Sequence, residues 1–192
     1  MSEDQQNNVF GPLTNLIGTW QGNKGVDMAP ERDGLDENGY YETIEFVPVD
    51  DEIENAEEQE LVALHYHKVV RRLSNDNVFH DETGYLIWED ATKTIMHSLV
   101  IPRGVGLIAG GCCSIDDTQE NEVTFSMTAG GDNTDWPIMQ SPFMLDKAQT
   151  TAFTHKMSFT RDKLSYAHTT TVEIYGRIFE HTDQNVLTKA DA

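Results

Sequence analysis

Short runs rich in β-branched and aromatic residues recur along the whole chain, and each is bounded by Gly, Pro, Asn or Asp. Periodic helical stretches are scarce by comparison. This pattern is typical of many short β-strands in an antiparallel sheet. The predicted strands span residues 43–47, 60–71, 84–88, 94–101, 105–109, 122–128, 150–160 and 163–175.

The joins between these runs are short and polar, as at residues 74–77, 116–121 and 161–163. Such joins favour hairpins, and no long helix is present to carry a parallel crossover. We therefore predict an all-β fold, a single antiparallel up-and-down β-barrel of about eight to ten strands. Closure would remove the exposed edges and leave an interior that could hold one small ligand.

Three stretches differ from this pattern. Residues 23–40 contain Gly25, Pro30, Gly34 and Gly39 and are predicted to form a loop. Residues 50–60 are acidic but lack the ligand spacing of a calcium-binding EF-hand, so we expect a solvated connection. Residues 1–9 are predicted to be a disordered polar tail, and residues 10–190 to be one barrel domain.

Composition limits the classes of partner. The 192 residues are 38% hydrophobic, enough for one sizeable core. The 33 acidic and 13 basic residues give a net charge of −20, which disfavours nucleic acid and anionic membrane surfaces as partners. The sequence contains no apolar stretch of membrane-spanning length and no signal peptide, so we expect a cytoplasmic protein. The oligomeric state, including a homodimer, stays open.

The two cysteines, Cys112 and Cys113, are adjacent. Neighbouring residues in a strand point to opposite faces, so this pair suggests neither a disulfide framework nor a zinc site. We expect reduced, structural thiols.

The chain has seven histidines, and period-two alternation assigns several of them to the barrel interior. His97, His155 and His168 each share a strand face with apolar neighbours. Buried imidazoles need hydrogen-bond partners, so this number of inward rings favours a ligand pocket with polar groups. His65 and His67 also share a face, and without a third ligand they indicate a half-buried polar stripe or an interior pair rather than a zinc site.

A Gly-x-Trp-x-Gly motif, Gly18-Thr19-Trp20-Gln21-Gly22, opens the barrel sequence, and Gly25 follows it. Trp20 is predicted to plug the barrel base, where the glycines let the first strand bend. Near the other end of the chain, His181 comes shortly after the predicted strand 163–175. It is the first candidate for a functional side chain.

These motifs, with the segment Phe79-His80-Asp81-Glu82-Thr83-Gly84-Tyr85, resemble those of the nitrobindin-like haem-binding β-barrel family. The chain departs from the family pattern at the displaced Gly25, at Thr182 after His181 and in longer segments at 23–40 and 129–149. The resemblance implies a lipocalin-like or fatty-acid-binding-protein-like barrel that holds haem b, with His181 as the iron ligand. His80 and His97 are the candidates for the opposite wall of that pocket.

The resemblance further implies a haem-dependent enzyme that isomerises peroxynitrite to nitrate and whose ferrous form binds nitric oxide. No Cys-x-x-Cys-His motif is present, so the haem would be held without covalent attachment. The alternative is a carrier of a small hydrophobic ligand such as a fatty acid, without catalysis, in which Arg103 meets an anionic head group. A barrel that serves only as an interaction module is a third possibility.

Overall fold

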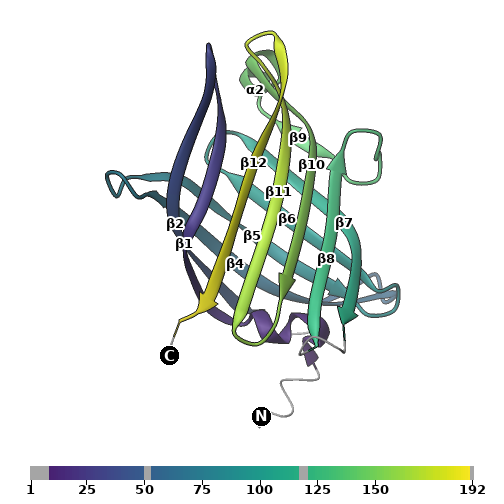
Figure 1. The fold of residues 1–192 in the computed structure, drawn as a ribbon. Helices are drawn as coiled ribbons and strands as arrows, with labels where there is room; N and C mark the ends of the chain where they lie inside the picture. Colours follow the sequence, from purple (N-terminus) through teal and green to yellow (C-terminus); the bar gives the residue numbers. More distant parts are fainter. Residues whose placement is uncertain (1–8, 50–52, 117–120, 191–192) are drawn as a thin grey trace.

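In the part of the chain that the structure describes, ten antiparallel strands close into a barrel, and two short strands lie outside it (Figure 1). The computed structural model describes residues 9–49, 53–116 and 121–190. The barrel strands are β1 (Gly18–Glu31), β2 (Gly34–Pro48), β4 (Gln59–Arg72), β5 (Val78–Glu89), β6 (Thr94–Ile101), β7 (Val105–Asp116), β8 (Glu122–Gly130), β10 (Ala148–Phe159), β11 (Lys163–Ile174) and β12 (Arg177–Lys189). The outer strands β3 (Ile53–Asn55) and β9 (Ile138–Gln140) pair with β4 and β7.

Closure comes from β1, which pairs with both β2 and β12, and from the additional pairing of β2 with β4. Most strands that are consecutive in sequence are also neighbours in the sheet. The predicted all-β, up-and-down barrel is therefore confirmed. The described ranges also contain the 3-10 helix η1 (Gly11–Leu16) and the short helix α2 (Pro142–Lys147). None of the helices in the described ranges is long and apolar enough to cross a membrane.

The prediction of a loop at residues 23–40 was wrong. This segment forms most of the β1–β2 hairpin, paired from Gly25↔Tyr40 to Glu31↔Gly34. It lacks apolar alternation because most side chains in the outer half of the hairpin are exposed or half-buried and contribute little to the hydrophobic core. Its order comes from the main-chain ladder, which side-chain patterns do not report.

The last strand was also missed. Residues 177–189 form β12, which follows β11 through a tight turn at Tyr175 and Gly176, both with positive φ. Of the acidic segment 50–60, residues 53–55 form β3 and residues 50–52 lie outside the described residues. Residues 1–8 of the predicted tail also lie outside them.

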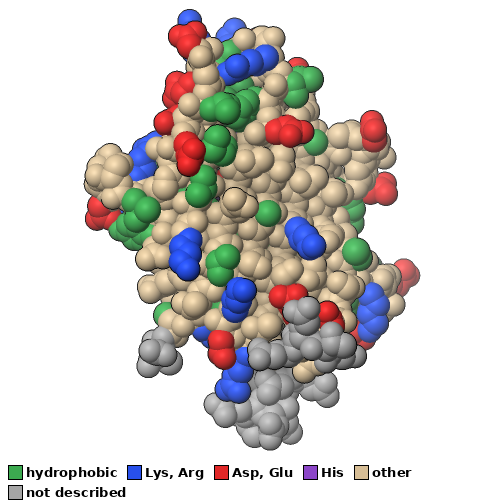
Figure 2. Space-filling view, in the orientation of Figure 1, with side chains coloured by type: hydrophobic (Ala, Val, Ile, Leu, Met, Phe, Trp, Pro, Cys, Tyr) green, Lys and Arg blue, Asp and Glu red, His purple; other side chains and the backbone are tan. Residues whose placement is uncertain are grey.

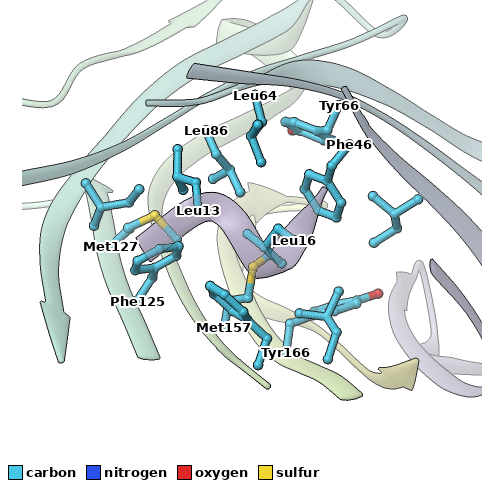
Figure 3. Packing of buried hydrophobic residues seen from close by; sticks show 14 of the residues in the cluster. Leu13, Leu16, Phe46, Leu64, Tyr66, Leu86, Phe125, Met127, Met157 and Tyr166 are labelled. Carbon is cyan, nitrogen blue, oxygen red and sulfur yellow. The ribbon is translucent and has the colours of Figure 1, made fainter. Parts of the chain in front are cut away.

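The barrel base is sealed by apolar side chains. Trp20 is fully buried, as predicted, and its indole Nε1 donates a hydrogen bond of 2.7 Å to the carbonyl of Leu16 in η1. Figure 3 shows Leu13 and Leu16 of this helix among Leu64, Leu86, Phe125, Met127 and Met157. The 3-10 helix thus acts as a plug, and a ligand would have to enter from the opposite end of the barrel.

Gly25 marks an irregularity that the fold requires. The register of β1 against β2 shifts between Gly22 and Gly25. A Cβ at Gly25 would lie 2.0 Å from the ring of Tyr40. The glycine therefore lets the buried Tyr40 ring lie against the backbone of β1.

On the outer face shown in Figure 2, acidic, basic and hydrophobic side chains are interspersed, and no histidine colour appears over β10, β11 and β12. The histidines of these strands are His155, His168 and His181. His155 and His168 line a cavity inside the barrel. Both cysteines are free thiols, Cys112 exposed and Cys113 half-buried.

We expect Trp20→Ala to destabilise the barrel by about 3–5 kcal/mol, because truncating a buried aromatic ring leaves a cavity in the core. Urea unfolding measures this effect. Tyr85→Ala, at a side chain that is 44% exposed, is the control and should change stability far less. An unchanged unfolding midpoint for Trp20→Ala would show that the plug does not hold the base together.

Candidate functional site

Polar side chains fill the middle of the barrel. Because the barrel is closed, alternate residues of each strand face a space shared with every other strand. Several of these inward residues are polar or charged and yet buried, which requires partners from other strands. They are Asp27, Glu42, Lys68, Glu82, His97, His155 and Asn185.

An ion pair lies at the centre of this interior. Lys68 Nζ is 3.4 Å from Glu42 Oε2, and both side chains are almost fully buried. Tyr166 donates to the Glu42 carboxylate at 2.8 Å, and Asn185 donates to it at 2.7 Å. Burial alone would lower the pKa of Lys68, but the carboxylates of Glu42 and Glu82 hold this pKa above its ordinary value. Lys68 therefore carries its charge at neutral pH, and the Glu42 side chain beside it accepts hydrogen bonds from Tyr166 and Asn185.

A second group runs from the mouth to the centre. His80 Nε2 lies 3.1 Å from Glu82 Oε2, and Tyr66 donates to Glu82 Oε1 at 2.7 Å. His97 Nε2 is 2.8 Å from the Tyr66 hydroxyl, and His97 Nδ1 is 3.3 Å from Nδ1 of His155. Burial lowers the pKa of His97 to about 4 and the pKa of His155 well below its ordinary value, so both rings are neutral. We call these five residues the relay.

The third group lies at the mouth, where β12 meets β1. His181 Nε2 is hydrogen bonded to Asp27 Oδ1 and is 3.7 Å from Asp183 Oδ2. Asp183 is held in turn by His168 Nε2 at 2.8 Å. The donor atoms of Asp27, His181 and Asp183 lie within 4.8 Å of one another. We call these three residues the mouth cluster.

The carboxylates at the mouth stabilise the protonated form of His181. Burial lowers the pKa of His181, but the bond to Asp27 and the charge of Asp183 outweigh burial and leave this pKa raised. Burial raises the pKa of Asp183, but the His168 bond outweighs it and leaves this pKa well below its ordinary value. Two carboxylates therefore share the His181 ring. Imidazole and carboxylate groups are also the ligands that transition-metal ions take in proteins.

The structure places the predicted histidines as follows. His97, His155 and His168 face inward, as alternation indicated. His181 lies within β12, not on a connection beyond the last strand, and the carboxylate that orients it is Asp27. His65 and His67 lie on the outer face, bonded to Thr83 and Asp81, so the expectation of an interior pair was wrong and the polar stripe is what forms.

Sequence reasoning missed most partners of the histidines. Tyr66 and Lys68 share the inner face of β4 with Leu64 and Val70, an alternation that was available in the sequence. Asp27 gave no signal, because it lies in the segment predicted as a loop and 154 residues before His181.

The donor set at the mouth fits haem b, but the barrel centre does not. Nδ1 of His181 has no hydrogen-bond partner among the described residues, and the ring is 31% exposed, so one nitrogen is available to a metal. The central cavity is about 20 Å³. Space of this size holds roughly one water, whereas pockets for larger ligands measure about 300–1,000 Å³. Phe46, Tyr66, Lys68, His97, His155 and Tyr166 occupy the centre instead.

Residues 9–189 match the model of the family described as the THAP4-like, heme-binding beta-barrel domain. The chain belongs to this family. The crystal structure of Rv2717c from M. tuberculosis is similar, with a TM-score of 0.72 and 21% sequence identity over 95% of this chain and 99% of that chain. This likeness shows the shared fold, and no curated protein matches the chain. The family resemblance seen in the sequence motifs is thus confirmed, and haem is the cofactor of the family as described.

We expect Lys68→Met to destabilise the barrel by about 3–5 kcal/mol, because it leaves the Glu42 carboxylate buried without its counter-charge. Adding Glu42→Gln should restore much of this loss in urea unfolding. Lys156→Met, at an exposed lysine of β10, is the control. If Lys68→Met were as stable as Lys156→Met, that result would contradict a central ion pair.

The neutral state of His97 predicts a pH dependence. Its folded pKa of about 4 lies below the ordinary 6.5, so the unfolded chain takes up the proton first as the pH falls. The stability contributed by the neutral ring should be lost between those two values, on the order of 3 kcal/mol. Unfolding at about pH 7 and about pH 4.5 measures this loss. The free energy of unfolding should depend less on pH in His97→Gln than in His67→Gln. Equal slopes in the two variants would contradict a neutral His97 in the folded protein.

Proposed function

We propose that this barrel binds haem b at its mouth and that His181 supplies the iron ligand. The observation that carries the proposal is the state of the His181 ring, held at Nε2 by Asp27 and without a partner at Nδ1 among the described residues. Histidines that bind metals commonly donate their other ring N–H to a carboxylate, which orients the ring and increases its basicity. The family match over residues 9–189 supports the choice of cofactor.

Other residues would complete the pocket. Arg103 follows β6 at the mouth, and its positive charge acts to lower the pKa of His181. Arg103 is therefore close enough to the mouth cluster to pair with the carboxylates of a bound haem. His80 on β5 and His97 on β6 remain the candidates for the opposite wall, because these strands lie across the strand order from β12. The closed centre below would keep bulk water away from the bound group.

When bound, haem would supply an iron atom that can bind small ligands. We extend the proposal to nitric oxide binding and to isomerisation of peroxynitrite to nitrate, on the strength of the family resemblance. In this scheme Asp27 accepts the Nε2–H bond of His181 and fixes the ring. The relay offers neutral, hydrogen-bonding side chains on the inner side of the pocket.

The carrier hypothesis receives less support. A fatty-acid chain needs an apolar tunnel, and the centre of this barrel holds a cavity of about 20 Å³ beside a buried ion pair. No observation in the described residues favours that function over haem binding.

Titration with haemin, followed by absorbance, tests the proposal. Wild type and His67→Ala, an exposed histidine on the outer face, should develop a Soret band, and His181→Ala should not. Asp27→Asn should bind haemin about 10–100-fold more weakly, as is usual when the carboxylate behind a metal-binding histidine is removed. A Soret band that persists in His181→Ala and disappears in His155→Ala would show that His155, not His181, binds the iron.

The same haemin titration, repeated at several pH values, tests the protonation of His181. Iron takes the neutral ring, so haem affinity should fall as the pH drops through the raised pKa of His181. Asp27→Asn should move this midpoint to lower pH, because Asp27 stabilises the protonated ring. Nitrate yield from peroxynitrite, measured for the haem-loaded protein against free haem, tests the finer activity.

A further inference from the structure

Nε2 of His155 is a buried nitrogen without a partner. Among the described residues it is the one buried side-chain nitrogen or oxygen that makes no hydrogen bond. The residue is 7% exposed and lines the central cavity. A buried polar atom left in this state is costly, and it commonly marks a bound water or ligand.

The relay determines which nitrogens carry protons. Glu82 is ionised, because the bond from His80 and the charge of Lys68 outweigh burial and hold its pKa well below the ordinary value. Tyr66 therefore donates its hydroxyl proton to Glu82 and accepts from His97, which must carry its proton on Nε2.

The next step follows from the neutrality of both rings. Nδ1 of His97 is then an acceptor, so Nδ1 of His155 must donate across the 3.3 Å contact. A neutral His155 that is protonated at Nδ1 has a bare lone pair at Nε2. The carboxylate at one end of the chain of bonds thus determines the chemistry of the nitrogen at the other end.

The surroundings of this nitrogen limit the ligand. Metal ions take several protein ligands, but the other imidazoles and the carboxylate that line this cavity already have partners: His97 and Glu82 are bonded within the relay, and His168 is bonded to Asp183. The Lys68 ammonium also lines the cavity. The His155 ring lies 6.0 Å from that of Phe153 and 5.8 Å from that of Tyr166, so the walls are largely aromatic. Such a site accepts a hydrogen bond and suits a small uncharged molecule.

We propose that Nε2 of His155 is the acceptor atom of an interior binding site for a small, neutral hydrogen-bond donor, and that the relay keeps this atom unprotonated. The site is distinct from the mouth cluster and requires no haem. Water would occupy it in the absence of another donor.

Nuclear magnetic resonance of haem-free protein labelled with ¹⁵N at histidine tests the proposal, so the result does not depend on whether His181 binds iron. The spectra should show His97 protonated at Nε2 and His155 protonated at Nδ1. Methanol, a small donor, should shift the Nε2 resonance of His155 in a saturable way. Fluoromethane, which is similar to methanol in size and has no hydroxyl donor, should not.

Three results would overturn the proposal: a protonated Nε2 in His155, no saturable response to methanol, or an equal response to both probes. Tyr66→Phe removes the hydroxyl that links Glu82 to His97 and should mix the tautomers of His97 and His155. Tyr85→Phe, at an exposed tyrosine, is the control. If Tyr66→Phe does not fold, Glu82→Gln removes the charge while keeping the shape, and unchanged tautomers in the folded variant would refute the relay.

Discussion

Closure of the barrel is the constraint on which the rest of the structure depends. Once β1 pairs with both β2 and β12, and β2 with β4, the inward side chains of ten strands face one shared space. Bulk water cannot satisfy polar groups there, so they must satisfy one another. Glu42 illustrates the result, because its carboxylate is met by Lys68, Tyr166 and Asn185 from three other strands.

The interior is divided along the barrel axis. The base is apolar and plugged by Trp20 and η1, the centre is polar and nearly full, and the mouth carries carboxylates and histidines with partial exposure. This order separates two kinds of chemistry. Groups that need a rigid, dry setting lie at the centre, whereas His181, which would have to meet a large cofactor, lies where the barrel opens.

The agreement between sequence and structure is best where one face of a strand is apolar. The run 94–101 coincides with β6, and alternation placed His97 and His155 inside. It is poorest where main-chain pairing alone maintains the strand. The outer part of the β1–β2 hairpin buries little apolar surface and contains turn-forming residues, so the sequence predicted a loop there. Asp27 lies in this part and was therefore not identified as the partner of His181.

The sequence by itself determined the fold class, the family and the face on which most of the inward histidines lie, because these follow from local alternation and short motifs. Only the tertiary structure decided which inward groups meet. Asp27 reaches His181 from 154 residues away, and the relay joins side chains of β4, β5, β6 and β10. Such distances depend on the register of every intervening strand pair and on the closure of the barrel. The volume left at the centre depends on the same two quantities, and neither is encoded in any single segment.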